Sequence, residues 1–200
     1  MTIKTYAEAC DRNRAPIFAI IEPLLKNSSA VLEIGSGTGQ HAVFFAPRLP
    51  HLVWYTSDIK DNHGDIRAWL KESDATNVKG PLLLDVKQVD WPELAVDAVF
   101  TANTLHIMHW EEVEIFFSRI GSILPAGGLL LVYGPFNYHG DYTSESNARF
   151  DLWLKARDPN SGIRNFQDLD VLASNQGLQL QSDYEMPANN RILHWQKSVQ

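Results

Sequence analysis

The chain has 200 residues, of which 44% are hydrophobic, so it is long enough for one domain with a substantial core over residues 1–200. Its 17 basic and 24 acidic side chains give a net charge of -7, which argues against a nucleic-acid or anionic-membrane partner. No apolar run approaches the roughly 20 residues that cross a bilayer, and the N-terminus lacks the features of a secretion signal. With a single cysteine, Cys10, which cannot form an internal disulfide, these features predict a cytoplasmic protein.

Short β-type segments alternate with helical patterns along most of the chain. The first helix is expected from about Ala15, where Pro16 suits a first turn. Further helical patterns cover 40–48, 63–73 and 111–123. The expected strands are nearly continuously apolar, as strands covered on both faces are, and lie at 30–34, 52–57, 80–84, 98–102 and 128–133. This alternation predicts a parallel sheet with helices on both faces.

The last part of the chain departs from this alternation. Helical patterns at 144–157 and 166–175 precede two strands, at 178–185 and 191–197. The connection 186–190 has the Pro and Asn content of a turn, so the two strands are expected to form an antiparallel hairpin. The predicted fold class is therefore α/β, a Rossmann-like doubly wound sheet of about seven strands, mostly parallel with one antiparallel strand near the C-terminus.

The most informative segment is a strand that runs into a glycine-rich turn and then a helix, Val31-Leu32-Glu33-Ile34-Gly35-Ser36-Gly37-Thr38-Gly39-Gln40-His41. Glycine permits a positive φ and lets a ligand approach the backbone, and the helix start presents unpaired N–H groups. A dinucleotide fingerprint, G-x-G-x-x-G, would place its third glycine where Gln40 stands. The spacing therefore argues against binding of NAD or a flavin.

The pattern E-x-G-x-G-x-G after a first strand resembles the cofactor loop of class I S-adenosylmethionine-dependent methyltransferases. The wider chain is similar to that superfamily, and most closely to a small stand-alone methyltransferase-like family whose substrate is not established. The resemblance covers nearly the whole chain, from 9–14 to 189–190. It implies an enzyme that uses S-adenosylmethionine, releases S-adenosylhomocysteine and methylates a small-molecule acceptor.

The resemblance also implies which residues hold the cofactor. Glu33 is expected to hold the ammonium of the methionine moiety, and the glycine loop to contact that moiety through its backbone. Asp58 is expected to accept two ribose hydroxyls, and Asp85 the adenine amino group, although each Asp is alternatively a turn or capping residue. The expected cofactor-binding set is Arg14, Glu33, Gly35, Ser36, Gly37, Thr38, Gly39, Asp58, Ile59, Asp85, Val86, Asn103, Leu105 and His106.

The acceptor is expected near the carboxyl ends of the fourth and fifth strands, since open α/β sheets bind ligands at that edge. His106 or His109 is the candidate catalytic base for an OH or NH acceptor, and each is alternatively a packed or hydrogen-bonded histidine. Substrate-binding candidates are Asn13, expected just before the first helix, and Tyr138, Asn189 and Asn190.

No metal site is expected, because the chain has no tight cluster of His, Cys, Asp and Glu with ligand spacing. Two other classes of function stay open at this point. One is a regulatory or scaffold protein that keeps the cofactor pocket without turnover. The other is a dinucleotide or nucleotide-sugar enzyme built on a similar sheet. The sequence names neither the acceptor nor the oligomeric state.

Overall fold

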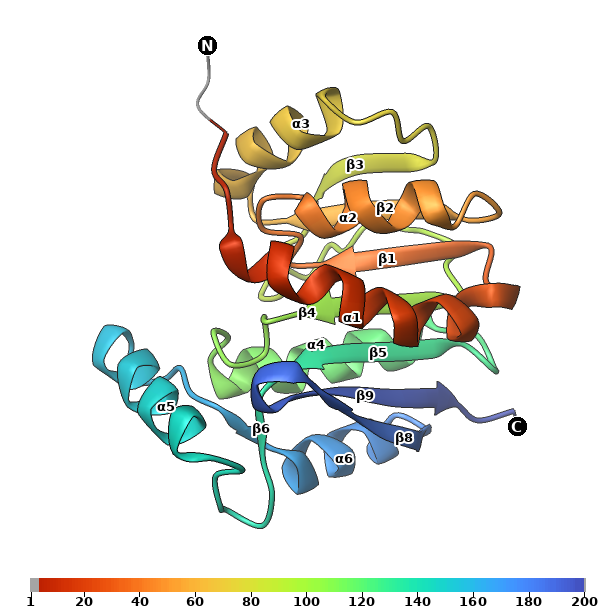
Figure 1. Ribbon diagram of the computed structural model, residues 1–200. Helices are drawn as coiled ribbons and strands as arrows, with labels where there is room; N and C mark the ends of the chain where they lie inside the picture. Colours follow the sequence, from red (N-terminus) through yellow and green to blue (C-terminus); the bar gives the residue numbers. More distant parts are fainter. Residues whose placement is uncertain (1–3, 200) are drawn as a thin grey trace. The chain divides into compact units, whose positions relative to one another are not determined.

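The structure, a computed structural model, describes residues 4–199. Within this range seven strands form one sheet in the order β3-β2-β1-β4-β5-β9-β8 (Figure 1). β9 runs antiparallel to both β5 and β8, whereas β1 pairs in parallel with β2 and β4, and β2 with β3. The predicted Rossmann-like sheet, with one antiparallel strand near the C-terminus and helices around it, is confirmed.

The described residues divide into two compact units, one ending at Thr101 and the other beginning at Ala102. That residues 1–200 form a single domain stays a prediction.

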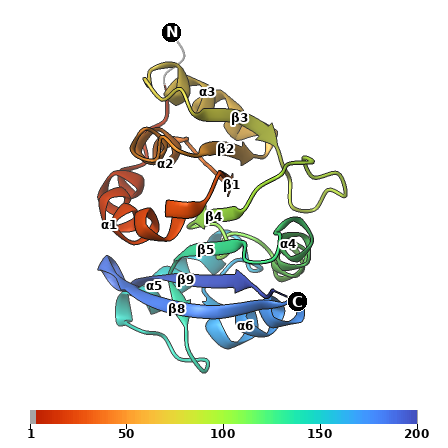
Figure 2. The ribbon, with the colours of Figure 1, turned by 90° about the vertical axis from the view of Figure 1, so that its right-hand side faces the viewer.

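The first unit holds β1 (Ala30–Ile34), β2 (Val53–Asp58), β3 (Val78–Leu83), all but the last residue of β4 (Ala98–Ala102), α1 (Glu8–Leu24), α2 (Gln40–Phe45), α3 (His63–Lys71) and the 3-10 turns η1 (Leu25–Asn27), η2 (Ala46–Arg48) and η3 (Lys60–Asn62). α1 packs on α2, α2 on α3, and α3 on β3 (Figures 1 and 2). An aromatic cluster of Phe45, Trp54 and Phe100 lies in its core. Buried apolar side chains thus fix the strand that carries Glu33.

The expected start of the first helix was wrong, since α1 begins at Glu8 and Pro16 lies inside it. Acidic Glu8 and Asp11 in the first turn stabilise the amino end of the helix dipole. Buried Ile17 then packs the stretch that contains Pro16, so packing outweighs the backbone hydrogen bond that proline cannot donate. As a result Asn13 and Arg14 lie on α1 rather than before it.

The second unit holds α4 (Trp110–Ile123), β5 (Leu129–Gly134), β6 (Phe136–Asn137), α5 (Glu145–Arg157), β7 (Arg164–Asn165), α6 (Phe166–Asn175), β8 (Leu178–Met186), the 3-10 turn η4 (Pro187–Asn189) and β9 (Asn190–Lys197). α4 packs on α6, and α6 on β8. The turn between β8 and β9 places Ala188 and Asn189 at φ near 58° and 57°, which confirms the predicted hairpin. The short pair β6 and β7 was not predicted, because two residues carry no periodicity.

Candidate functional site

The first unit brings the glycine loop and two of the predicted cofactor residues to one edge of the sheet. β1, β2 and β3 are parallel, so their carboxyl ends meet there. The glycine loop follows β1, Asp58 ends β2, and Asp85 follows β3. This edge is the place where open α/β sheets bind ligands.

The glycine loop is left-handed at each of its three glycines, with φ of 72° at Gly35, 57° at Gly37 and 86° at Gly39. A Cβ on Gly39 would stand 3.2 Å from Ile66 Cα, so this glycine lets the loop pack on α3. A Cβ on Gly37 would have nothing within 4 Å. Gly37 therefore faces open space that a ligand can fill.

Glu33 is a buried acid beneath this loop, with only 1% of its surface exposed. Its Oε2 accepts hydrogen bonds from Trp54 Nε1 at 3.1 Å and from Ser36 Oγ at 2.9 Å, while Oε1 accepts from neither donor. Burial raises the pKa of the carboxyl to about 7, even though these two hydrogen bonds act in the opposite direction. A ligand cation would favour the ionised form.

Asp58 ties the loop to the end of β2. Its Oδ2 accepts from Gly37 N at 2.7 Å, and its Oδ1 accepts from Ile59 N and from Asn62 Nδ2, each at 2.8 Å. A carboxylate offers about four acceptor positions, so about one remains for a ligand hydroxyl. A second hydroxyl would have to displace the Asn62 side chain. Asp58 is thus both a structural residue and a candidate ligand acceptor.

The third strand contributes Asp85 and Val86. Asp85 Oδ1 accepts from Lys87 N at 3.0 Å, the geometry of a turn, and Val86 is buried. Directly after β2, Ile59 leaves 44% of its surface exposed, which is high for an apolar side chain. The turn role proposed for Asp85 as an alternative is therefore present, and it leaves the second carboxylate oxygen outside this hydrogen bond.

Three further predicted residues, two that the structure places on α1 and one at the end of the glycine loop, also have partners. Asn13 Oδ1 pairs with His41 Nε2 at 2.7 Å. Arg14 pairs with Asp11 at 2.6 Å and lies over the Phe44 ring. The loop residue Thr38 donates from its hydroxyl to a buried side chain of α2 at 3.0 Å.

In the second unit, the loop after β4 carries the other predicted site residues. Asn103 has a φ of 58° and donates from its backbone to Tyr133 O at 2.9 Å. Leu105 and His106 are buried, and the imidazole of His106 meets the Phe150 ring edge-on at 5.2 Å. Burial lowers the pKa of His106 to about 4, so the ring is neutral at physiological pH.

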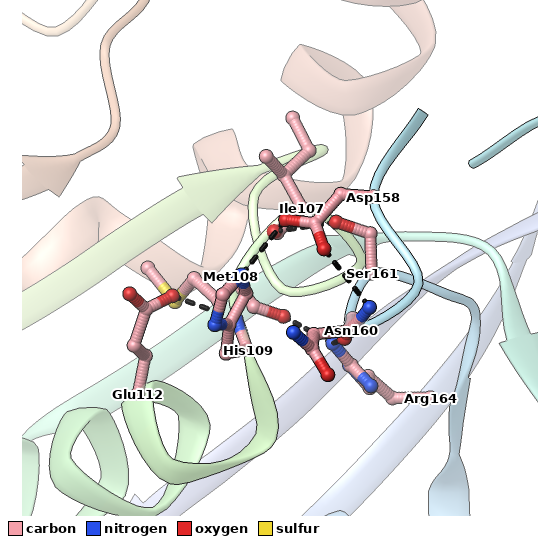
Figure 3. A network of polar contacts seen from close by, with 8 residues as sticks. All are labelled: Ile107, Met108, His109, Glu112, Asp158, Asn160, Ser161 and Arg164. Atoms are coloured by element: carbon pink, nitrogen blue, oxygen red, sulfur yellow. Dashed lines mark hydrogen bonds and ion pairs between the residues drawn. The ribbon is translucent and has the colours of Figure 1, made fainter. Parts of the chain in front are cut away.

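Four successive carbonyls of this loop accept hydrogen bonds from segment 161–164, part of which Figure 3 shows. The pairs are Arg164 Nε with Leu105 O, Gly162 N with His106 O, Ser161 Oγ with Ile107 O, and Arg164 Nη2 with Met108 O. The loop backbone around His106 is therefore held on every residue from 105 to 108.

His109 has a structural task at the start of α4. Its backbone N–H donates to Glu112 Oε2 at 2.6 Å, and its Nε2 lies 2.7 Å from Asp158 Oδ2 (Figure 3). These contacts fix both the helix end and the ring. A catalytic role for either histidine stays a prediction.

The predicted substrate residues of the second unit are each tied to neighbours. Tyr138 donates to Asp183 Oδ2 at 2.6 Å and stacks on Phe166. Asn189 O accepts from Asn147 Nδ2 at 3.0 Å. Asn190 Nδ2 donates to carbonyls of its own turn. They stabilise the loops that carry them, and a role toward substrate stays a prediction.

The sequence analysis did not identify Trp54, which donates to the Glu33 carboxyl, or Asn62, which donates to the Asp58 carboxylate. A tryptophan in a buried strand needs an acceptor for its N–H, and that rule offered a signal for Trp54. No local pattern indicated Asn62, because its contact with Asp58 depends on the η3 turn.

Among residues 4–199, no three His, Cys, Asp or Glu side chains form a group able to hold a metal ion. Nor does any helix in that range have the length and apolar character to span a membrane.

The order and direction of the seven strands define the Rossmann-like fold of S-adenosylmethionine-dependent methyltransferases. The model of a family described as "Protein of unknown function (DUF938)" matches residues 4–197. The chain belongs to this family.

Solved structures share the fold at low sequence identity. An O-methyltransferase family protein from Burkholderia thailandensis matches with a TM-score of 0.84 and 16% identity, over 96% of this chain and 58% of that one. Human N-acetylserotonin methyltransferase in complex with S-adenosylmethionine gives 0.75 and 15%, over 96% and 58%. An O-methyltransferase family 2 protein from Planctomyces limnophilus, in complex with apigenin, gives 0.78 and 18%, over 92% and 57%. The chain spans less than two thirds of each of these proteins.

Proposed function

We propose that this chain is an S-adenosylmethionine-dependent methyltransferase that acts on a small-molecule acceptor in the cytoplasm. The observation that carries the proposal is the buried carboxyl of Glu33 beneath a loop of three left-handed glycines. Relatives in fold that bind S-adenosylmethionine or apigenin support both the cofactor and the size of the acceptor.

The first unit offers groups that match each part of this cofactor. Glu33 suits the ammonium of its amino-acid end, and Arg14 suits the carboxylate. The open space at Gly37 lets the chain between them pass close to the backbone. Asp58 would take a ribose hydroxyl, and Asp85 with the apolar side chains of Val86 and Ile59 would hold the adenine ring. Gly35, Ser36, Thr38 and Gly39 are the other predicted cofactor residues of this unit. Asn103, Leu105 and His106 belong to the second unit, and their role toward the cofactor stays a prediction.

When bound, S-adenosylmethionine supplies a sulfonium-linked methyl group for in-line transfer, so the protein mainly aligns the acceptor. His106, neutral because of its burial, would accept a hydrogen bond from the OH or NH group of the acceptor and so orient it. The tied carbonyls of 105–108 keep the backbone of His106 fixed during transfer. On methylation, the acceptor would give up its proton to the imidazole.

Radioactive methyl transfer tests the catalytic part of the proposal. The purified protein is incubated with methyl-labelled S-adenosylmethionine and a small-molecule extract of its host cells. We expect label in a small molecule, and a marked loss of label with His106→Ala, because the acceptor is no longer oriented. A protein that binds S-adenosylhomocysteine yet transfers no label above the blank would instead be a non-catalytic binder.

Cofactor binding should depend on pH through Glu33. The free protein holds a proton on this carboxyl below about pH 7, and the ligand ammonium needs it ionised. The dissociation constant for S-adenosylhomocysteine should therefore rise as pH falls from 7.5 to 5.5, approaching about tenfold per pH unit, as expected for one linked proton. Calorimetry across this range measures it.

Glu33→Gln is the control for this pH dependence. It should bind more weakly and lose most of the slope, because an amide does not titrate. The stability of the free protein should change with pH in the opposite sense to the affinity: the contribution of Glu33 falls as pH rises. The raised pKa means that the folded state keeps the proton longer than the unfolded state, so this group's contribution to stability is lost as pH rises from about 4.5 to about 7. If the dissociation constant of S-adenosylhomocysteine depends on pH equally in wild type and Glu33→Gln, Glu33 does not bind the ligand ammonium.

A further inference from the structure

We propose that Gln40 clamps the start of α1 onto the glycine loop, and that this clamp retains the amino-acid end of the bound cofactor. The inference rests on the proposed function and adds a positioning residue to it. Gln40 stands where a dinucleotide fingerprint would have its third glycine. The same residue that argues against NAD binding is therefore proposed to position the start of α1.

The clamp consists of hydrogen bonds in both directions between one side chain and one backbone residue. Gln40 is only 2% exposed. Its Oε1 accepts from Ala7 N at 2.6 Å, and its Nε2 donates to Ala7 O at 3.4 Å. Oε1 also accepts from the Thr38 hydroxyl at 3.0 Å. A primary amide can accept and donate at once, so glutamine pairs with a peptide group as neither glycine nor alanine can.

Residues 4–14, here called the strap, are held at further points. Thr5 N donates to Asp65 Oδ1 at 2.9 Å, and Trp69 Nε1 donates to Thr5 O at 2.8 Å, so α3 anchors one end. Toward the other end, Asn13 pairs with His41 on α2. Gln40 is the anchor in the middle, next to the glycine loop.

The strap lies against the part of the site that would take the amino-acid end of the cofactor. Ala7 N of the strap and the Thr38 hydroxyl of the glycine loop donate to the same atom, Gln40 Oε1, at 2.6 Å and 3.0 Å. Burial, and after it the charge of Glu33, raises the pKa of the Cys10 thiol on the strap. Glu33 itself is almost fully covered. Gln40 Oε1 therefore joins the strap to Thr38 of the glycine loop, beside the place proposed for the amino-acid end of the cofactor.

The clamp makes a selective prediction about ligands. S-adenosylhomocysteine carries the amino-acid tail, whereas 5′-methylthioadenosine has the same adenosine and sulfur without it. Loosening the strap should weaken the binding of S-adenosylhomocysteine and leave the binding of 5′-methylthioadenosine nearly unchanged. A residue that merely supports the fold would affect both ligands equally.

Gln40→Ala and Trp69→Phe test the proposal by calorimetry and stopped-flow binding of both ligands. Gln40→Ala should raise the dissociation constant of S-adenosylhomocysteine about tenfold, mostly through faster release, because the two hydrogen bonds to Ala7 and the one from Thr38 are lost. The constant for 5′-methylthioadenosine should change less than about twofold by the same reasoning. Trp69→Phe removes one of the two hydrogen bonds between the strap and α3 without touching the glycine loop, and it should act in the same direction more weakly. Hydrogen exchange should speed up at the Ala7 amide in Gln40→Ala.

Gln196→Ala is the matched control, since Gln196 also donates to a backbone carbonyl, that of Gly127, but lies in the other unit. It should bind both ligands as wild type does. If wild type binds S-adenosylhomocysteine while Gln40→Ala and Trp69→Phe match it, or if both ligands weaken equally, the clamp is overturned and the proposed function stands. If Gln40→Ala fails to fold, Trp69→Phe decides. If wild type does not bind S-adenosylhomocysteine, the proposed function fails first and the clamp fails with it.

Discussion

Gly37→Val is expected to reduce affinity for S-adenosylhomocysteine by at least about 100-fold, which is a loss of about 2.8 kcal/mol. Gly37 has a φ of 57°, where a β-branched residue is strained, and the added side chain would fill the open space beside the loop. The protein itself has nothing within 4 Å of the new Cβ, so the fold should survive. Calorimetry measures the affinity, and the melting temperature should fall by roughly 2–8 °C for about 1–2 kcal/mol of backbone strain.

Gly127→Val is the matched control for this substitution. Gly127 also has a positive φ, of 80°, and a Cβ there also meets nothing within 4 Å, but it precedes β5 in the other unit. Its melting temperature should fall by a similar amount while affinity stays at the wild-type value. If Gly37→Val binds S-adenosylhomocysteine normally, the glycine loop is only a structural turn.

Asp58→Ala is expected to weaken S-adenosylhomocysteine binding by roughly 10- to 100-fold, taking about 1.5–3 kcal/mol for a hydrogen bond to a charged group with partial rescue by water. It should also lower the melting temperature of the free protein, because the N–H groups of Gly37 and Ile59 and the Asn62 amide lose their acceptor. Asp58→Asn should lie between wild type and Asp58→Ala, since an amide oxygen still accepts. Titration calorimetry and thermal unfolding separate the two effects.

Asp97→Ala is the control for the structural part of this effect. Asp97 accepts from the backbone N–H groups of Ser29 and Ala30, at the start of β1 and so at the other end of that strand from the glycine loop. Its loss should lower the melting temperature with unchanged affinity. Asp85→Ala should cost less affinity than Asp58→Ala, because Asp85 is assigned a single adenine contact. An unchanged dissociation constant for Asp58→Ala would make Asp58 a turn residue alone.

The sheet and the glycine loop were predictable because their signals are local. Apolar strands alternate with helical patterns, and the G-x-G-x-G spacing places a glycine at each of the three left-handed positions, Gly35, Gly37 and Gly39. Pro187, Asn189 and Asn190 indicated the turn of the antiparallel hairpin at the end of the chain. In each case, residues close in sequence decide the backbone.

The parts that could not be predicted depend on partners distant in sequence. The start of α1 is set by packing and by the clamp from Gln40, so the local signal at Pro16 misled. The double role of Asp58 follows from contacts with Gly37 and Asn62, which motif spacing does not reveal. The hold of segment 161–164 on the carbonyls around His106 likewise joins residues more than fifty positions apart.

Titration of S-adenosylhomocysteine and, separately, of NAD into the wild-type protein tests the central claim most directly. The open space at Gly37, the buried Glu33 and the Gln40 side chain where a dinucleotide site needs glycine all predict the same result. S-adenosylhomocysteine should bind saturably at one site, and NAD should give no binding heat. Saturable binding of NAD with no response to S-adenosylhomocysteine would contradict the account.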